Sequence, residues 1–517
     1  MKRILRIFIT ILAISLTAIS CQKPENEGEE ISYQEQKRRK ELKDAQQYLK
    51  TTIMDTYYYW YDKMPNKGYS ADIEIKKYFN SLLYFKDRWS WMMDGKEYVD
   101  LESGVVSGTL GASFGQPWMD LSRHFAGDFN VVVRFVYPDS PFDKAGVTRG
   151  YILDELDDHS VQDYYLSYPG THVDEFNDIL NDPGTTTAHK FRFKTPDGEY
   201  VTVNVTAVET LNTRPGLVKK IFTAADYPGL TQPVGYFHYL SFMADDDAFG
   251  KSMLEDITEA MDYFKRNNVK KLILDLRYNG GGDSRASNLL VSYLAPTSAR
   301  GQVYVSRTHN DKCSSEDESY VIQSPADAIS SLEKDKNSGV TFTCKPDSPE
   351  FDQLFFITGR GSASASEMTL NGLKPLANLK HVGDTTYGKP NGMYVFYYPF
   401  DNAAKTQYYK GDFSKLKYVF LPICFYNFNG LGQNIPDDGM IPECVIPDDL
   451  YHDFNAEEMN INACLYYVVN GTYPKLDIHL TQSNATNDSQ GKKHMMFKSE
   501  EDSDENWGRY VVKPDFL

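Results

Sequence analysis

The chain has 517 residues, enough for two or three domains, each with its own core. Its formal net charge is -18, from 72 acidic and 54 basic residues. Because phosphate groups would be repelled, this charge argues against nucleic acid or anionic lipid as the main partner. Aromatic residues make up 14% of the chain, and tyrosine-rich surfaces suit contacts with peptides.

The first 20 residues resemble a secretory signal peptide. Three basic residues precede an apolar run over 7–19, which is too short to span a membrane stably. Ala18-Ile19-Ser20-Cys21 resembles a bacterial lipobox, in which Cys21 becomes the lipidated first residue. The alternative is an ordinary cleaved signal with an incidental cysteine. Residues 21–37 are polar and acidic, as expected of a tether. We therefore expect a lipid-anchored protein of a Gram-negative cell envelope, at the outer membrane and facing the periplasm or the surface.

Residues 38–103 predict a small N-terminal helical domain. Leu42, Ala45, Leu49 and Ile53 follow helical spacing, and the pattern continues through 73–83. The aromatic cluster at 57–61 is interpreted as a packing surface against the next domain.

Residues 104–212 change to short strands and turns, which predicts a β domain. The stretch Gly108-Thr109-Leu110-Gly111-Ala112-Ser113-Phe114 resembles the loop of PDZ domains whose backbone amides bind a C-terminal carboxylate. This resemblance makes Gly108, Leu110, Gly111 and Phe114 candidate peptide-binding residues. Residues 173–180 would form the groove helix, and Pro196-Asp197-Gly198 would turn the closing hairpin. A generic small β domain is the alternative.

Residues 213–475 predict an α/β core. A strand over 234–242, a helix over 248–267 and a strand over 271–276 form a βαβ crossover, which implies parallel strands covered by helices. The polar segment 300–348 is expected to be a surface excursion, and 457–470 a terminal helix. Residues 476–517 are polar and predict a flexible tail.

A triple-glycine turn follows the strand at 272–276. In Asp275-Leu276-Arg277-Tyr278-Asn279-Gly280-Gly281-Gly282, the glycines let backbone amides face a ligand without obstruction by side chains. These amides are candidates for an oxyanion hole. No Gly-Lys-Ser/Thr and no GxGxxG spacing accompanies the turn, so nucleotide binding is disfavoured.

A candidate nucleophile lies at a second strand-to-helix junction. The apolar run 355–358 and Gly359-Arg360-Gly361 lead into Ser362-Ala363-Ser364-Ala365-Ser366-Glu367, where the start of a helix offers N–H groups to an oxyanion. Lys389 follows Ser364 by 25 positions, between Gly388 and Pro390. A lysine can act as the base for a serine when burial lowers its pKa toward neutrality. The alternative is a structural role, because Ser364-x-x-Glu367 is also a capping box.

Together these segments resemble the carboxy-terminal processing (tail-specific) proteases, a family of Ser/Lys peptidases with a PDZ domain. The resemblance covers most of residues 40–470. It implies that Ser364 is the nucleophile and Lys389 its base, and that the amides of Gly282 and Ala365 form the oxyanion hole. The family often has a glutamine four residues after the lysine, and this chain has Met393 there. The orientation of Lys389 must therefore come from elsewhere, or activity is weak. A Ser-His arrangement through His381 is a lower-ranked alternative.

The cysteine pattern does not indicate a metal site. The five cysteines after Cys21 have neither CxxC nor Cys/His spacing. In an oxidising envelope, Cys313 could pair with Cys344, or Cys424 with Cys444, and the odd count leaves a free thiol.

The sequence therefore predicts a multidomain α/β and α+β protein with an N-terminal helical domain, a PDZ-like β domain and an α/β serine peptidase core. Its expected function is that of an envelope serine endopeptidase, which needs no metal or organic cofactor. The substrate would be an unfolded polypeptide or one with an exposed C-terminus. The rival hypothesis is a peptide-binding scaffold of the same fold that is weakly active or inactive. The oligomeric state is left open.

Overall fold

The computed structural model describes residues 32–102, 104–115, 130–161, 176, 178–180, 183–244, 252–334, 340–399 and 415–475. The expected signal peptide, Cys21, most of the tether, most of the groove helix and the 476–517 tail lie outside these ranges. None of the helices within them is both long and apolar enough to cross a bilayer.

The N-terminal region is mainly helical, and its predicted helical face is buried. Ser32 caps helix α2 by accepting a hydrogen bond from the Glu35 N–H at 3.2 Å, so the helix begins within the stretch expected to be a tether. Leu42, Ala45, Leu49 and Ile53 all lie in one buried cluster. The elements are α2 (Tyr33–Tyr48), a π-helical turn (Leu49–Met54), α3 (Asp55–Tyr57), a 3₁₀ turn (Tyr61–Lys63), α4 (Ile75–Leu82), β1 (Trp91–Asp94) and α5 (Gly95–Glu102).

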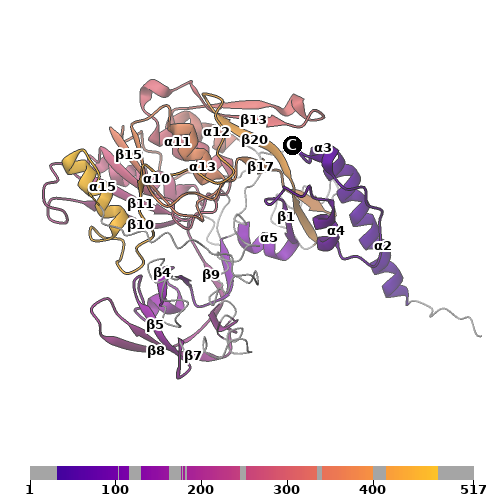
Figure 1. Ribbon diagram of the computed structural model, residues 1–517, viewed down its shortest axis with the longest axis horizontal. Coiled ribbons are helices and arrows are strands. Elements are labelled where there is room, and N and C mark those ends of the chain that lie inside the picture. The colour runs from indigo at the N-terminus through magenta and orange to yellow at the C-terminus, as the bar shows by residue number, and fades with distance from the viewer. Residues whose placement is uncertain are drawn as a thin grey trace, which may run out of the picture.

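This region shares its sheet and its core with a distant part of the chain. Strand β1 pairs antiparallel with β19 (Tyr418–Leu421), which also pairs with β18 (Phe396–Tyr398). Phe420 from β19 belongs to the same buried cluster as the N-terminal helices. The helices therefore cover a sheet built from both ends of the sequence (Figure 1).

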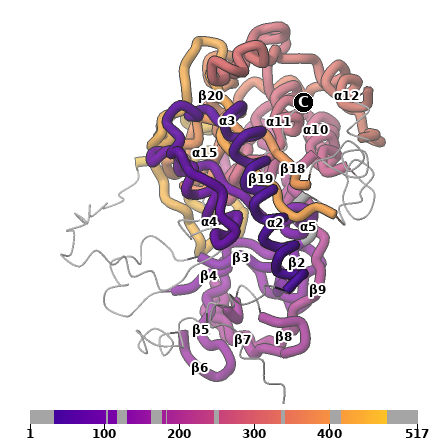
Figure 2. Tube along the Cα trace, turned by 90° about the vertical axis from the view of Figure 1, so that its right-hand side faces the viewer, coloured from indigo at the N-terminus to yellow at the C-terminus, as the bar shows by residue number. Residues whose placement is uncertain are grey.

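A small β module follows and carries its own aromatic core. Its sheet has the strand order β3-β4-β5-β7-β8, with β6 paired to β5. Phe142, Phe191 and Phe193 lie at the centre of this core. The predicted turn at 196–198 is confirmed, because Gly198 has φ +88° and joins β7 to β8. The module lies below the rest of the molecule in Figures 1 and 2. Its elements are β3 (Ala112–Gly115), β4 (Val131–Val136), α7 (Pro141–Lys144), β5 (Ile152–Leu156), β6 (His159–Ser160), β7 (Ala188–Lys194) and β8 (Tyr200–Thr206).

A two-stranded ribbon connects this module to the main body. It consists of β2 (Val105–Thr109) and β9 (Val208–Asn212), which pair antiparallel. In Figure 1, β9 descends from the main body toward the module.

The main sheet has the order β10-β11-β12-β15-β16-β21, and all of its pairs are parallel except β10–β11. Helix α10 connects β11 to the parallel strand β12, so the predicted βαβ crossover is confirmed. Residues of β11 are buried along its whole length, as expected for a strand covered on both faces. The strands are β10 (Gly216–Phe222), β11 (Val234–Tyr239), β12 (Lys271–Asp275), β15 (Gln353–Thr358), β16 (Leu379–Gly383) and β21 (Cys444–Val445).

Helices cover both faces of this sheet. One core cluster joins alternate strand residues to α10, α11, α12 and α13, and a second joins the opposite strand faces to α15. In Figure 1, α15 lies on the side of β15 and β11 away from the N-terminal helices. The helices are α10 (Glu255–Arg266), α11 (Ser284–Leu294), α12 (Pro325–Lys334), α13 (Ala365–Leu373) and α15 (Met459–Asn470), with a 3₁₀ turn at Thr297–Ala299.

The segment expected to be a surface excursion instead contributes strands to a four-stranded sheet of order β14-β13-β20-β17. Strand β13 buries Tyr304 and Val305 and pairs with β20 more than a hundred residues away. The strands are β13 (Val303–His309), β14 (Glu318–Val321), β17 (Asn391–Met393) and β20 (Ile423–Asn429), and a 3₁₀ turn occupies Ser314–Glu316. All five described cysteines are free thiols, so neither expected disulfide is formed.

Candidate active site

The backbone at Ser364 is strained. Strand β15 ends at Thr358, and α13 begins at Ala365, which makes Ser364 its N-cap residue. Ser364 has φ +55° and ψ -113°, whereas an N-cap residue normally has β-region angles. Capping alone therefore does not explain this conformation, and strain of this kind in a residue other than glycine is concentrated at functional sites. The Ser364 side chain is 7% exposed.

The two neighbouring serines tie this turn to the end of strand β12. The Ser362 hydroxyl donates to the Leu276 carbonyl at 2.7 Å, and the Ser366 hydroxyl donates to the Asn279 carbonyl at 3.0 Å. The Ala363 N–H also donates to the Asn279 carbonyl, at 3.1 Å. The serine turn and the triple-glycine turn are thus one hydrogen-bonded unit, as the sequence interpretation required.

The glycines of this turn are needed for close approach. A Cβ atom on Gly281 would lie 2.7 Å from the Ser364 Cβ and 3.0 Å from the Ala365 nitrogen. A Cβ on Gly282, which has φ +138°, would lie 2.3 Å from the Phe242 carbonyl oxygen. Gly281 therefore lies against the serine, and the side of Gly282 where a Cβ would project is occupied by Phe242.

The two N–H groups expected for an oxyanion hole, those of Gly282 and Ala365, have no acceptor among the described residues. The Gly281 N–H donates to the Asn279 side chain at 2.9 Å. Within the described ranges, neither the Gly282 N–H nor the Ala365 N–H donates to any protein atom. These are the two amides expected for an oxyanion hole, and they are available to an incoming oxygen.

Lys389 is buried and has a lowered pKa. Its side chain is 1% exposed, and burial lowers its pKa to about 8, against the opposing effect of the Glu367 and Asp87 carboxylates. The amine lies 4.0 Å from the sulfur of Met393. A thioether is a weak acceptor, so Met393 packs against the amine without fixing its direction.

Glu367 joins the serine turn to the lysine segment. One of its carboxylate oxygens accepts from the Ser364 N–H at 3.0 Å and from the Lys389 N–H at 2.9 Å. The other accepts from the Thr386 hydroxyl at 2.5 Å and the Gly388 N–H at 2.8 Å. The side chain is fully buried, and burial raises its pKa despite these four donors.

This carboxylate brings Ser364 and Lys389 together. In the sequence, Glu367 is recognisable only as half of a capping box. This pattern is the signal for its contact with the Lys389 segment. The box is present, because the Glu367 side chain accepts from the N-cap N–H. The Glu367 oxygen that caps α13 by accepting from the Ser364 N–H therefore also links Ser364 to Lys389.

The two nearby histidines are poor candidates for the base. His381 Nε2 lies 2.7 Å from the Thr358 hydroxyl, which itself donates to the Asp384 carbonyl at 2.8 Å. The Nε2 nitrogen must therefore be the donor to Thr358, and burial lowers the pKa of His381 to about 3. His238 contacts the Arg277 carbonyl at 3.1 Å, and burial lowers its pKa to about 4.

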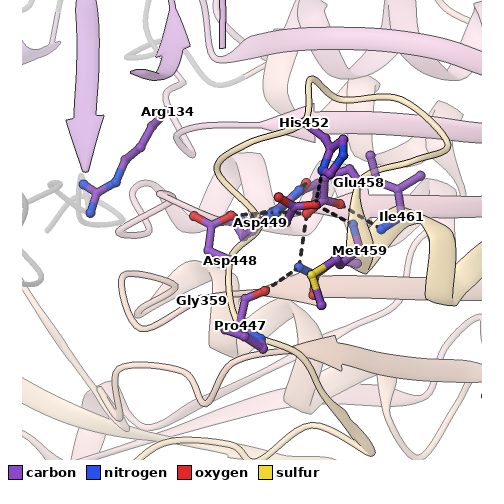
Figure 3. Close-up of polar contacts among 12 residues, drawn as sticks. Arg134, Gly359, Pro447, Asp448, Asp449, His452, Glu458, Met459 and Ile461 are labelled. Atoms are coloured by element: carbon purple, nitrogen blue, oxygen red, sulfur yellow. Dashed lines mark hydrogen bonds and ion pairs between the residues drawn. The ribbon is translucent and has the colours of Figure 1, made fainter. Parts of the chain in front are cut away.

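A buried ionic network anchors the strand end that leads to the glycines. Arg277 pairs with Asp275 at 2.6 Å, Glu458 at 2.7 Å and Asp448 at 2.8 Å. Figure 3 shows Asp448 and Glu458 on the segment that leads into α15. Arg149 of the β module joins the network by donating to the Tyr278 hydroxyl at 2.8 Å. Three distant parts of the chain thus meet beside the triple-glycine turn.

The four residues of the expected peptide-binding loop lie together at the start of the β module. The side chains of Leu110 and Phe114 are 2% and 3% exposed and belong to the core of the module. Gly108 and Gly111 have φ +61° and +81°. The Gly111 N–H donates to the Thr109 hydroxyl at 2.9 Å. The side chains of Leu110 and Phe114 therefore stabilise the module. A bound peptide would have to contact the remaining backbone groups of the loop.

No cluster of three or more potential metal-ligating side chains occurs in the part of the chain that the structure describes. The groups that contact the serine turn are backbone groups, two serine hydroxyls and the Glu367 carboxylate, which also contacts the backbone N–H of Lys389. The arrangement can therefore activate a hydroxyl, receive its proton and bind a developing negative charge.

Comparisons with known proteins indicate a peptidase. The family model of peptidase family S41 matches residues 233–411, and that of the peptidase S41 N-terminal domain matches residues 52–91. These matches define the class of protein as a serine-type peptidase. Over these two stretches the chain is similar to peptidase family S41.

One solved structure shows a similar fold. A protein from Bacteroides fragilis NCTC 9343 assigned to the S41 proteases is 18% identical, with a TM-score of 0.61, and the match covers 81% of this chain and 97% of that chain. The photosystem II D1 C-terminal processing protease is 16% identical, with coverage of 79% and 93% and a TM-score of 0.39. The Bacteroides fragilis protein thus has a fold similar to that of this chain.

Proposed function

We propose that this chain is an endopeptidase of the cell envelope in which Ser364 attacks a peptide bond and Lys389 acts as its base. The observation that carries the proposal is the Glu367 carboxylate oxygen, which accepts from both the Ser364 and the Lys389 N–H groups. A strained serine and a buried lysine of lowered pKa are thereby held at one place. The match of residues 233–411 to the model of peptidase family S41 supports a peptidase and a polypeptide substrate.

The proposed chemistry needs only groups of the protein and water. The neutral Lys389 amine takes the proton of the Ser364 hydroxyl as Oγ bonds to the scissile carbonyl carbon. The Gly282 and Ala365 N–H groups receive the oxyanion. The C–N bond then breaks, and Lys389 returns the proton to the leaving amine. Water hydrolyses the resulting ester and regenerates the serine.

The β module is proposed to capture substrate chain ends as a PDZ-like domain. Support comes from its strand order and from the glycine loop before β3, with φ values of +61° and +81° at Gly108 and Gly111. An added peptide strand would gain backbone hydrogen bonds, as in other β-augmentation complexes. Lipidation at Cys21 and attachment to the outer membrane of a Gram-negative envelope remain part of the proposal, on the sequence pattern alone.

The rival hypothesis, a binding scaffold without turnover, is favoured by Met393, which stands where the family often has a glutamine. Met393 does not orient the Lys389 amine, as the rival requires. Against it stand the lowered pKa of Lys389 and the N–H groups of Gly282 and Ala365, which have no acceptor in the part of the chain that the structure describes; a scaffold needs neither feature.

The pH dependence of activity tests the proposal. The chain lacking residues 1–21 is expected to cleave an unfolded protein. Its kcat/KM should rise tenfold per pH unit below about pH 8 and level off above it, because only the neutral amine of Lys389 can accept a proton. The measurement is kcat/KM from pH 5.5 to 9.5.

Two results would contradict this expectation. Absence of cleavage at every pH, with peptide binding intact, would favour the scaffold. A profile that is complete by pH 6 would assign the base to a group other than Lys389.

A further inference from the structure

The segment that precedes β1 contacts the residue next to Lys389. The indole N–H of Trp89 donates to the Gly388 carbonyl at 3.1 Å, in a buried position. The Arg88 guanidinium donates to the same carbonyl at 3.0 Å, to the Tyr387 carbonyl at 3.4 Å and to the Asp437 carbonyl. These contacts link the N-terminal helical region to the segment that carries the proposed base.

Trp89 is itself held firmly. The Asp87 side chain accepts from the Trp89 N–H at 3.0 Å and, through its other oxygen, from the Tyr58 hydroxyl at 2.8 Å. The Trp89 ring stacks on Trp60, with centroids 6.2 Å apart and planes 13° from parallel. The Arg88 guanidinium lies over two aromatic rings, 5.0 Å from the centre of the Trp89 ring and 5.0 Å from the centre of the Tyr387 ring. The donor to Gly388 therefore has one fixed direction.

The Gly388 carbonyl and the Lys389 N–H belong to one planar peptide group. Trp89 and Arg88 hold its oxygen, and Glu367 holds its N–H at 2.9 Å. A planar group that is bound at both ends cannot rotate, so the direction in which the Lys389 side chain leaves the backbone is fixed. The orientation that Met393 does not supply at the amine is thus supplied through the backbone.

We propose that Trp89, assisted by Arg88, is a positioning residue for the proposed base, and that the N-terminal helical region is thereby part of the catalytic apparatus. The inference rests on the proposed function, because it concerns the orientation of Lys389. It assigns to residues 87–89 a role in turnover, beyond their structural contacts.

The charged groups that face Lys389 come from two elements. Glu367 of α13 and Asp87 of the N-terminal region both favour the protonated amine, and Arg88 lies at the neighbouring carbonyls. Replacing Trp89 by phenylalanine changes none of these charges. The substitution therefore removes one hydrogen bond without moving the midpoint of the pH profile.

Trp89→Phe is expected to lower kcat for cleavage of an unfolded protein about tenfold, which corresponds to about 1.4 kcal/mol. KM and the pH midpoint should stay unchanged, because substrate contacts and charges are untouched. The chain offers a matched control in Trp91→Phe, since the buried Trp91 indole N–H has no acceptor among the described residues. This control should retain the wild-type kcat.

A second variant keeps the test decisive if Trp89→Phe folds poorly. Arg88 is exposed, so Arg88→Met removes its bonds to the carbonyls with little risk to folding, and kcat should again fall several-fold. Arg266→Met on α10 is the control, because Arg266 is exposed and pairs only with Asp262 in the described structure.

Equal kcat values for the Trp89 and Trp91 variants, or for the Arg88 and Arg266 variants, would overturn the inference while leaving the proposed function intact. Wild-type turnover that persists in Ser364→Ala would overturn the proposed function and the inference together. Loss of activity in strict proportion to the unfolded fraction would also overturn the inference, since it would assign Trp89 a purely structural role.

Discussion

Ser364→Ala is expected to lower kcat for cleavage of an unfolded protein by about 10⁴-fold or more, the range seen when a catalytic serine is removed. The hydroxyl is the proposed attacking group, and no other side chain of the serine turn can replace it. Ser362 and Ser366 donate to the carbonyls of Leu276 and Asn279. Substrate affinity should remain, because the proposed capture of the chain end lies in the β module. The measurements are steady-state kinetics and direct binding of a peptide.

Ser292→Ala is the matched control. Ser292 is a buried serine of α11 whose hydroxyl donates within its own helix, to the Leu289 carbonyl at 2.7 Å. Its replacement should change stability slightly and turnover not at all. If Ser364→Ala retained turnover comparable to that of this control, Ser364 would not be the nucleophile.

Lys389→Met is expected to lower kcat by about 10² to 10⁴-fold, the usual contribution of a general base. Methionine has a similar length and suits the buried site beside Met393, so the thermal midpoint should not fall. The backbone N–H that donates to Glu367 is kept, so the serine turn stays in place. Loss of turnover without loss of stability is the expected combination, measured by kinetics and thermal unfolding of the same sample.

Lys220→Met provides the comparison. Lys220 lies on the edge strand β10 and is half-buried, and burial also lowers its pKa. Burial therefore shifts its pKa in the same direction as that of Lys389, but Lys220 does not lie beside Glu367. Equal losses of kcat in the two variants would point to a general effect of buried charge and would contradict the assignment of Lys389.

The strands that carry the candidate site could be predicted because their signals are local. The apolar runs before the triple-glycine turn and before Ser364 are continuous, as expected for strands buried on both faces. The role of the glycines could be predicted because few residue types other than glycine fit where two backbone segments approach closely. Gly281 does lie against Ser364.

Other parts of the fold depend on contacts that no local pattern carries. Strand β13 alternates in burial but lies in a polar segment, and its partner β20 is remote in sequence. The N-terminal helices complete their core with Phe420, and Trp89 reaches Gly388 across 299 positions. Such pairings are set by tertiary packing, which overrides local composition.

The expected peptide-binding loop shows that a sequence pattern can predict a backbone conformation without predicting where the side chains point. The sequence pattern of Gly108–Phe114 gives the backbone conformation, and the positive φ values at Gly108 and Gly111 agree with it. It does not give the direction of the side chains, and Leu110 and Phe114 prove to be core residues of the β module. Glu367 illustrates the same point, since its capping pattern was visible but its bonds to Gly388 and Lys389 were not.

The most direct test of the central claim is the site and pH dependence of covalent labelling by a serine-directed fluorophosphonate. The account predicts one adduct per chain, mapped by mass spectrometry to Ser364, that is absent from Ser364→Ala. Its rate of formation should rise to a plateau above about pH 8 as Lys389 loses its proton. An adduct on another residue, or no adduct on the folded chain at any pH, would contradict the claim that Ser364 and Lys389 form a catalytic pair.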